Sequence, residues 1–251
     1  IWIITANILK KFNMKSLHYK LPGKFSTNDG SIDFYLRIRN LIDKKKVILD
    51  LGAGRGDWYL DNNNRIAKQI QFLKNDVKKF YAADIDSLVL KNKASSKNLI
   101  IKNGKIPLKD KSIDIIICDW VLEHVENPDL FYKEVNRILK KGGTFCARTP
   151  HKFNYASIIS NFLEGWKLKD WLLNKSQPGR KKYFKSFYKM NTITKINRIF
   201  FNFKNNNFIA IPDPAYSFNI KIIYYIFKFI HFVTPRFFSG IIIIFLKKNY
   251  W

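Results

Sequence analysis

Short apolar runs alternate along the chain with segments whose apolar residues recur every three or four positions. Runs rich in Ile, Val, Leu and Phe are typical of strands buried on both faces of a parallel sheet, and the segments between them are typical of helices. This alternation predicts a doubly wound α/β sheet with helices on both faces. The predicted strands span residues 46–51, 79–84, 98–102, 113–118, 143–148, 208–212 and 240–246.

The clearest predicted helix spans residues 128–140. Pro128 suits its first turn, where the missing N–H has no partner to lose. The pair Gly142–Gly143 is expected to end this helix and to lead into the next strand. A later helix is predicted to begin at Asn191 or Thr192, since either side chain can cap a helix start.

Together these elements predict one Rossmann-like domain with seven mostly parallel strands and C-terminal insertions. A chain of 251 residues is long enough for such a core. Residues 1–45 are expected to form a helical or irregular lead-in, and residues 46–150 the core. Residues 151–251 are expected to hold an insertion that binds the acceptor, followed by the last strands of the same domain.

Residues 219–238 are the most apolar part of the chain. A membrane-spanning helix needs about 20 predominantly apolar residues, and polar residues interrupt this segment, so spanning is not expected. The apolar remainder is compatible with a helix buried on the sheet, which we prefer, or with a helix in a membrane interface. A narrow polar stripe along this helix is predicted from Lys221, Tyr224 or Tyr225, Lys228 and His231.

The chain is strongly basic, with 45 Lys and Arg against 19 Asp and Glu and a formal net charge of +26. The acids become rare in residues 151–251, which carry 17 basic and 3 acidic side chains. Such a positive field favours nucleic acid, anionic lipid or an acidic glycan as a partner. Lys, Asn and Ile are abundant throughout, however, so a compositional bias explains the charge equally well, and charge alone does not choose the partner.

Cysteine use and the N-terminus set further limits. Cys118 and Cys146 are the two cysteines, and no CxxC or Cys/His cluster is present. A disulfide framework, a structural zinc site and a catalytic metal are therefore not expected, and a reducing compartment is the default. The first residues lack the basic region and cleavage site of a signal peptide, and the absence of a starting Met suggests a truncated start.

Candidate ligand chemistry begins in residues 47–58, VILDLGAGRGDW. A glycine-rich turn between strand and helix lets a ligand approach the backbone N–H groups at the helix start. The GxxxxGK[ST] pattern of a triphosphate loop is absent. The glycines give GxGxG rather than the GxGxxG of a dinucleotide site, and Asp57, in place of the last glycine, would repel a pyrophosphate.

Two further acids point to a different ligand. Asp50 lies one residue from the end of the predicted strand before the glycine turn, where a carboxylate suits a cationic or amino-bearing molecule. S-adenosylmethionine (SAM) carries both an ammonium and a sulfonium. Asp84 ends the second strand, where an acid accepts the hydroxyls of a ribose in nucleotide-binding sheets of this kind.

The segments VILDLGAGRG, AADID and IPLKDKSIDIIICDWVLEHVENPDLFYKEVNRILKKGGTFCARTP, with the last apolar strand, resemble the successive motifs of class I SAM-dependent methyltransferases of type 11. The resemblance covers residues 46 to 151. It implies SAM as cofactor, with its methionine part near the first motif, its ribose on an acid and its adenine beside an apolar residue. The residues so implied are Asp50, Gly52, Gly54, Gly56, Asp84, Ile85, Asn103 for the adenine amine, and Asp119 where donor and acceptor meet.

Within that class, GAGRGDW, DWVLEHVENP, CARTPH, SQPGRKKYFKSFYKMNT and PDPAYSF resemble bacterial methyltransferases of lipopolysaccharide and surface-polysaccharide synthesis. This resemblance implies a glycan or glycolipid acceptor and a cytoplasmic location. It is compatible with peripheral contact to an anionic membrane through residues 219–238. The stretch KKYFKSFYKMNT departs from that group's pattern. An RNA methyltransferase and a non-catalytic SAM-fold protein that binds a membrane or partner remain alternatives, and the oligomeric state is left open.

Transfer of a methyl group to a hydroxyl needs a base that removes the hydroxyl proton. His124 and His151 follow predicted strands at the edge where such sheets bind ligands, and Asp119 is a third candidate. The basic and aromatic stretch 166–188 is the candidate for acceptor recognition, through stacking and phosphate or carboxylate pairing. A solvated cationic loop is the equally favoured alternative for that stretch.

Overall fold

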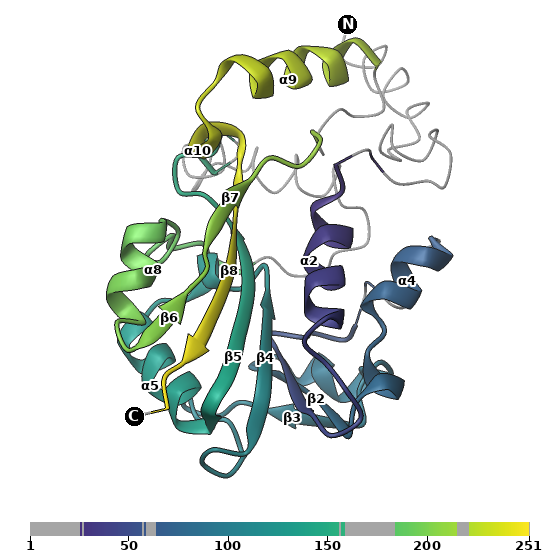
Figure 1. The fold of residues 1–251 in the computed structure, drawn as a ribbon, viewed down its shortest axis with the longest axis vertical. Helices are drawn as coiled ribbons and strands as arrows, with labels where there is room; N and C mark the ends of the chain where they lie inside the picture. The colour runs from purple at the N-terminus through teal and green to yellow at the C-terminus, as the bar shows by residue number, and fades with distance from the viewer. Residues whose placement is uncertain are drawn as a thin grey trace, which may run out of the picture.

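The computed structural model describes residues 26, 28–56, 58, 64–155, 157–158, 184–214 and 221–250. Its centre is a sheet in the order β3-β2-β1-β4-β5-β8-β6, with β7 also paired to β8 (Figure 1). The first five strands are parallel, and β8 runs antiparallel to β5. The predicted Rossmann-like α/β fold is confirmed. The strands are β1 (Val47–Leu51), β2 (Lys79–Asp84), β3 (Lys97–Ile100), β4 (Ile113–Asp119), β5 (Leu139–Pro150), β6 (Phe203–Asn205), β7 (Phe208–Ala210) and β8 (Ile241–Lys248).

The seventh position of the sheet is shared by two short strands, since β6 and β7 pair with opposite ends of β8. Asn206 and Asn207 separate β6 from β7 and belong to neither strand. The Asn206 N–H donates to the Phe245 carbonyl at 2.9 Å, and the Phe245 N–H donates to Asn207 Oδ1 at 3.1 Å. These bonds continue the hydrogen-bonding to β8 between β6 and β7. The sheet therefore has the seven strand positions that were predicted, although the short strand β6 was not predicted.

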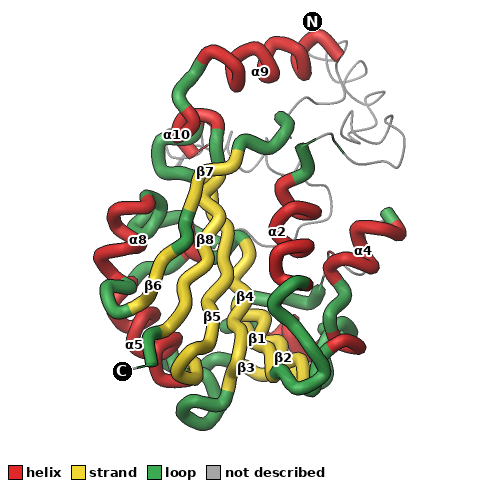
Figure 2. Tube along the Cα trace, in the orientation of Figure 1, coloured by secondary structure: helices red, strands yellow, loops and turns green. Residues whose placement is uncertain are grey.

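Helices cover both faces of the sheet, as predicted (Figures 1 and 2). Ile48 and Leu49 of β1 belong to different apolar clusters, because successive side chains of a strand point to opposite faces. Helix α2 packs into the Ile48 cluster, and α5 and α8 pack into the Leu49 cluster. The helices are α2 (Gly30–Arg39), α4 (Arg65–Gln71), α5 (Pro128–Ile138), α8 (Ile193–Ile199), α9 (Lys221–Val233) and α10 (Arg236–Ser239), with 3₁₀ turns η3 (Lys74–Asp76), η4 (Ser87–Lys91) and η5 (Leu122–His124).

Helix α5 begins at Pro128, as predicted, but ends at Ile138, before the predicted glycine stop. Leu139 is already extended and pairs with Ile113 of β4, so Gly142–Gly143 lies inside β5. The register between β4 and β5 shifts just after this pair, and Gly142 has a φ of +71°. The glycines therefore accommodate an irregularity in the strand instead of ending the helix. Helix α8 begins after Thr192, which caps it by accepting from the Lys195 N–H.

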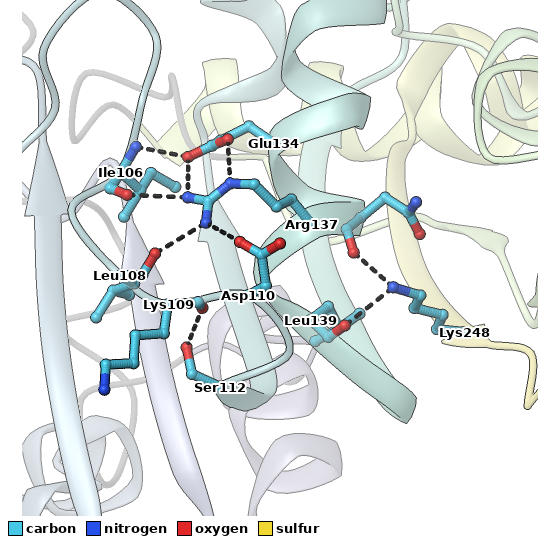
Figure 3. Close-up of polar contacts among 10 residues, drawn as sticks. Ile106, Leu108, Lys109, Asp110, Ser112, Glu134, Arg137, Leu139 and Lys248 are labelled. Atoms are coloured by element: carbon cyan, nitrogen blue, oxygen red, sulfur yellow. Dashed lines mark hydrogen bonds and ion pairs between the residues drawn. The ribbon is translucent and has the colours of Figure 1, made fainter.

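An arginine on α5 fastens the segment between β3 and β4 to the rest of the fold (Figure 3). The Arg137 guanidinium donates to the carbonyls of Ile106 and Leu108 and to the carboxylates of Asp110 and Glu134. Glu134 in turn accepts from the Ile106 N–H at 2.6 Å. Arg137 and Glu134 therefore have a structural role, because they fix the path of residues 106–110 into β4.

Helix α9 lies apart from the sheet, at the end of the molecule reached by β5 (Figure 1). Tyr224 is its one buried residue, and most of its apolar side chains are exposed. The preferred prediction of a helix buried on the sheet is therefore wrong. Periodicity identified the two sides of this helix, but it did not tell which side faces the protein. Among the described residues, no helix combines the length and apolar content needed to cross a bilayer.

Candidate cofactor and acceptor site

Three carboxylates gather where β1, β2 and β4 end. Asp50 of β1 pairs in register with Ala82 of β2 and Ile117 of β4, and Asp84 and Asp119 are the last residues of those neighbouring strands. Burial, and then the charges of Asp119 and Asp84, raise the pKa of Asp50 to about 8. A buried carboxylate in such surroundings is stabilised by a cation, so the site favours a positively charged ligand group.

The predicted glycine loop follows β1 directly and folds over the end of β2. The Gly52 N–H donates to the Ala83 carbonyl at 2.7 Å, and the Gly54 N–H donates to Asp84 Oδ2 at 2.8 Å. The other oxygen of Asp84 accepts from the Asp86 N–H at 2.9 Å. These bonds fix the orientation of the Asp84 carboxylate. Each oxygen retains a second lone pair, so the group can still accept from a pair of hydroxyls.

Gly52→Ala should weaken SAM binding about tenfold and lower the melting temperature. Gly52 has a φ of +80°, and an added Cβ would lie 2.3 Å from Val121 Cγ2, so the loop would have to shift. Gly104→Ala is the matched control. Gly104 also has a positive φ, of +70°, but no atom lies within 4 Å of its added Cβ. Calorimetry with SAM should show a loss for the first variant alone, and equal affinities would show that the loop does not hold the cofactor.

The two residues implied for adenine lie in different settings. Ile85 follows Asp84 directly and is 65% exposed, an unusual position for an isoleucine and one that a planar ring could cover. Asn103 is exposed in a tight turn with Gly104, where both residues have positive φ and Lys102 bridges to Lys105. An Asn-Gly turn accounts for this asparagine by itself, and its adenine contact stays a prediction. Asp57 lies outside the described residues.

Asp119 is held by an arginine that sequence reasoning missed. Arg148 lies opposite Asp119 in the register of β4 and β5, and both carboxylate oxygens of Asp119 accept from its guanidinium, one of them at 2.9 Å. The Tyr35 hydroxyl donates to the same carboxylate at 3.3 Å. With its oxygens engaged by a buried cation, Asp119 is better suited to position other groups than to accept a proton.

The lead-in contributes to this cluster through α2. Ser31 Oγ accepts from Arg148 at 2.8 Å, and the Phe34 ring lies 5.5 Å from the Arg148 guanidinium carbon. Trp120 lies 5.4 Å from the same carbon and has a φ of +56°, which is rare for a bulky residue and typical of functional sites. An arginine within the apolar strand GTFCAR was the available signal, but its partners depend on strand register and on α2.

His124 has a geometry suited to a base. It lies in η5, just beyond β4, and its Nδ1 is 2.9 Å from the carbonyl oxygen of Lys185. A carbonyl can only accept, so the proton of the neutral imidazole resides on Nδ1, and Nε2 holds the lone pair. The Ser186 hydroxyl is 3.5 Å from the same Nδ1.

His151 has the opposite arrangement. It is buried, and burial lowers its pKa below the usual value for histidine. The Phe153 N–H donates to His151 Nδ1 at 3.2 Å, so the lone pair of the neutral ring is already engaged. The ring also lies 5.9 Å from the Phe237 ring. The structure thus brings His151 to the end of β5 as a packed ring with Nδ1 engaged, and its role as a base stays a prediction.

A buried polar cluster joins η5 to the later part of the chain. Thr149 donates to Glu123 Oε2 at 2.8 Å and accepts from Asn191 Nδ2 at 2.6 Å. The Phe187 and Tyr188 N–H groups donate to the Glu123 carbonyl. The C-terminal end of the predicted acceptor-recognition stretch thus docks beside His124. Residues 166–183 of that stretch, with Arg180, Lys181 and Lys182, lie outside the described residues.

Comparison with known proteins identifies the class to which this site belongs. Residues 49–147 match a family model described as "Methyltransferase domain". A ribosomal RNA large subunit methyltransferase E of Methanococcus maripaludis is 27% identical over 120 residues, which cover 43% of this chain and 46% of that relative. The chain thus spans about half the length of the curated relatives that it matches.

Solved structures agree in fold. A chain from the complex of the Haloferax volcanii Trm112 methyltransferase activator with a methyltransferase has a TM-score of 0.53 at 14% identity, over 88% of this chain and 93% of that one. A SAM-dependent methyltransferase from Methanosarcina mazei has a TM-score of 0.53 at 15% identity, over 86% and 98%.

Residues 49–147 therefore match the methyltransferase domain family, and the resemblance of the motifs to SAM-dependent methyltransferases is confirmed. SAM is the cofactor of the class, and the residues present fit it: a buried carboxyl with a raised pKa precedes a loop of positive-φ glycines, and a second carboxylate on the neighbouring strand can accept from a ribose. The narrower resemblance to surface-polysaccharide enzymes stays a prediction.

Proposed function

We propose that the protein transfers the methyl group of SAM to a hydroxyl of a cell-surface glycan or of its lipid-linked precursor. The observation that carries the methyl-transfer part is the cluster of Asp50, Asp84 and Asp119 around the glycine loop, with burial raising the pKa of Asp50 to about 8. Such a cluster favours a ligand that brings both a cation and a ribose.

In this proposal each carboxylate has a separate task. Asp50 would pair with the ammonium of the methionine part, beside the loop that contains Gly52, Gly54 and Gly56. Asp84 accepts from the ribose hydroxyls, and Ile85 and Asn103 lie against the adenine. SAM supplies an electrophilic methyl on its sulfonium, so the chain's own contribution is alignment of the reactants and exclusion of water.

His124 is the proposed general base. Its Nε2 holds the lone pair of the neutral ring because Nδ1 donates to the Lys185 carbonyl. It would accept the hydroxyl proton as the hydroxyl oxygen bonds to the methyl carbon and the carbon–sulfur bond breaks, with the sulfur leaving as a neutral thioether. Asp119, held by Arg148, is a positioning residue at the rim. His151 supports the fold, since the Phe153 N–H occupies its lone pair.

The glycan acceptor rests on the resemblance of GAGRGDW, CARTPH and related stretches to surface-polysaccharide methyltransferases, and on the aromatic and cationic residues near 166–188. A second candidate is RNA. The net charge of +26 favours a polyanion, and one curated relative of the domain is a ribosomal RNA methyltransferase. Both candidates require SAM, and they differ in the acceptor alone.

SAM should raise the melting temperature of the purified protein by several degrees, because a ligand that binds the native state alone stabilises it by about 2.7 kcal/mol at 100 times its Kd. Incubation with methyl-labelled SAM and either extracted glycolipid or total RNA should then label the glycolipid. Label in the RNA alone would replace the proposed acceptor. No thermal shift at millimolar SAM would contradict the cofactor assignment itself.

A further inference from the structure

Helix α9 turns Tyr224, Phe227 and His231 toward the protein. Tyr224 is buried and hydrogen bonds to Asp213. His231 Nε2 lies 3.2 Å from the hydroxyl of Tyr155, and the ring of Phe227 stacks on the Tyr155 ring at 5.3 Å. The polar groups on this side of the helix therefore have partners within the fold, and this side anchors the helix.

The opposite side of α9 is apolar and exposed. At about 100° per residue, its side chains form one continuous arc along the helix. Phe232 is 86% exposed and Phe229 is 64% exposed. Contiguous apolar surface of this kind marks a binding face rather than ordinary solvent-exposed surface. The exposed residues are Ile222, Tyr225, Ile226, Phe229, Phe232 and Val233, and Phe237 of the following helix α10 is also exposed.

Cations border this apolar face. Lys221 and Lys228 are exposed and lie along one flank of the arc, and Arg236 begins α10. The sequence contains no Asp or Glu after Asp213. An apolar arc with a cationic flank is the arrangement of helices that lie in the interface of an anionic membrane, with the apolar side among the lipid tails and the lysines at the headgroups.

We propose that the α9–α10 face docks on the surface of an anionic lipid bilayer. Charge favours this occupant, because Lys221, Lys228 and Arg236 border the face. Asp213 lines a pocket together with Tyr225 and Phe229, but its carboxylate accepts a hydrogen bond from Tyr224 on the anchored side of the helix. The face is also joined to the carboxyl edge of the sheet: Asn154 donates to the Gly240 carbonyl at 3.0 Å, directly after α10, and His151 contacts Phe237. Docking therefore turns the end of β5 toward the membrane. If the proposed function is also right, a lipid-linked acceptor would meet the site from that side.

Vesicle flotation tests this proposal with the full chain. The protein should float with vesicles that contain 30% phosphatidylglycerol in phosphatidylcholine, a composition chosen to be on the order of bacterial anionic-lipid content, and float much less with phosphatidylcholine alone. F229S/F232S should bind the anionic vesicles at least about tenfold less. K221Q/K228Q should lose affinity for anionic vesicles alone. Phe201→Ser is the matched control, since Phe201 is 76% exposed at the end of α8, away from this face.

Size-exclusion chromatography of the same proteins completes the test. Failure of the wild type to float, or equal flotation of F229S/F232S, would overturn the proposal. A dimer that F229S/F232S converts to a monomer, without flotation of the wild type, would assign the face to a second copy of the chain. Flotation needs neither SAM nor an acceptor, so its failure is distinguishable from failure of the proposed methyl transfer.

Discussion

Replacing His124 by Asn should lower kcat about 10²- to 10⁴-fold, the usual contribution of a general base, while the Kd for SAM stays within about twofold. The asparagine amide can still donate to the Lys185 carbonyl that His124 Nδ1 contacts at 2.9 Å. It cannot accept a proton at neutral pH. The substitution therefore keeps the local hydrogen bond and removes the basic nitrogen, and single-turnover kinetics with saturating SAM measures the loss.

His151→Asn is the matched control for this prediction. His151 lies near the same end of the sheet, but its Nδ1 accepts from the Phe153 N–H and its ring is buried. We expect this variant to melt at a lower temperature, with kcat close to the wild-type value once it is folded. A large loss of kcat in the His151 variant, together with normal turnover of the His124 variant, would exchange the two roles.

The elements that the sequence predicted best are those decided by local patterning. Strand β1 is almost entirely buried, so its apolar run VILDL identifies it without knowledge of its neighbours. Strand β6 was missed because it is three residues long and only Phe203 is buried. Gly142–Gly143 was misinterpreted as a helix stop because the same residues suit a helix end and an irregular strand. The choice depended on pairing with β4.

The site residues also divide into those set by local sequence, which could be predicted, and those set by distant partners, which could not. Asp50, Asp84 and the glycines could be predicted because each lies in the last two residues of its own strand or in the following turn. Arg148 could not, since its partners come from β4 and from α2, which are distant in the chain. The different states of His124 and His151 depend on Lys185 and Phe153, and periodicity carries no information on such contacts.

Replacing Asp50 by Asn should have opposite effects on cofactor binding and on stability. The Kd for SAM should rise about 100-fold, because loss of one partner from a buried charge pair costs about 2–5 kcal/mol. Without SAM, the variant should be more stable than the wild type at pH 8. A neutral amide avoids the burial of charge that raises the pKa of Asp50 from 3.8 to about 8.

The pH dependence of this stability difference follows from the protons that the folded and unfolded chains bind. Between pH 4 and pH 8 the folded wild type keeps the Asp50 proton and the unfolded chain releases it, so this group lowers the free energy of unfolding as the pH rises through that window. The asparagine side chain of the variant has no proton to release. The variant's advantage should therefore be absent near pH 4 and should grow to about 1–3 kcal/mol at pH 8, or several degrees in melting temperature.

Thermal denaturation from pH 5 to pH 9, with and without SAM, measures both effects in one experiment. Asp114→Asn is the matched control, because Asp114 lies at the other end of β4, where it accepts from Lys140 Nζ and from the Val47 N–H. That variant should lose stability at pH 8 and keep its response to SAM. If Asp50→Asn also lost stability, the carboxylate would have a partner within the fold; if SAM still stabilised it fully, the cation of the cofactor would lie elsewhere. A variant that is more stable alone and unresponsive to SAM would show that the chain keeps this buried acid at a cost in stability because the ligand needs its charge.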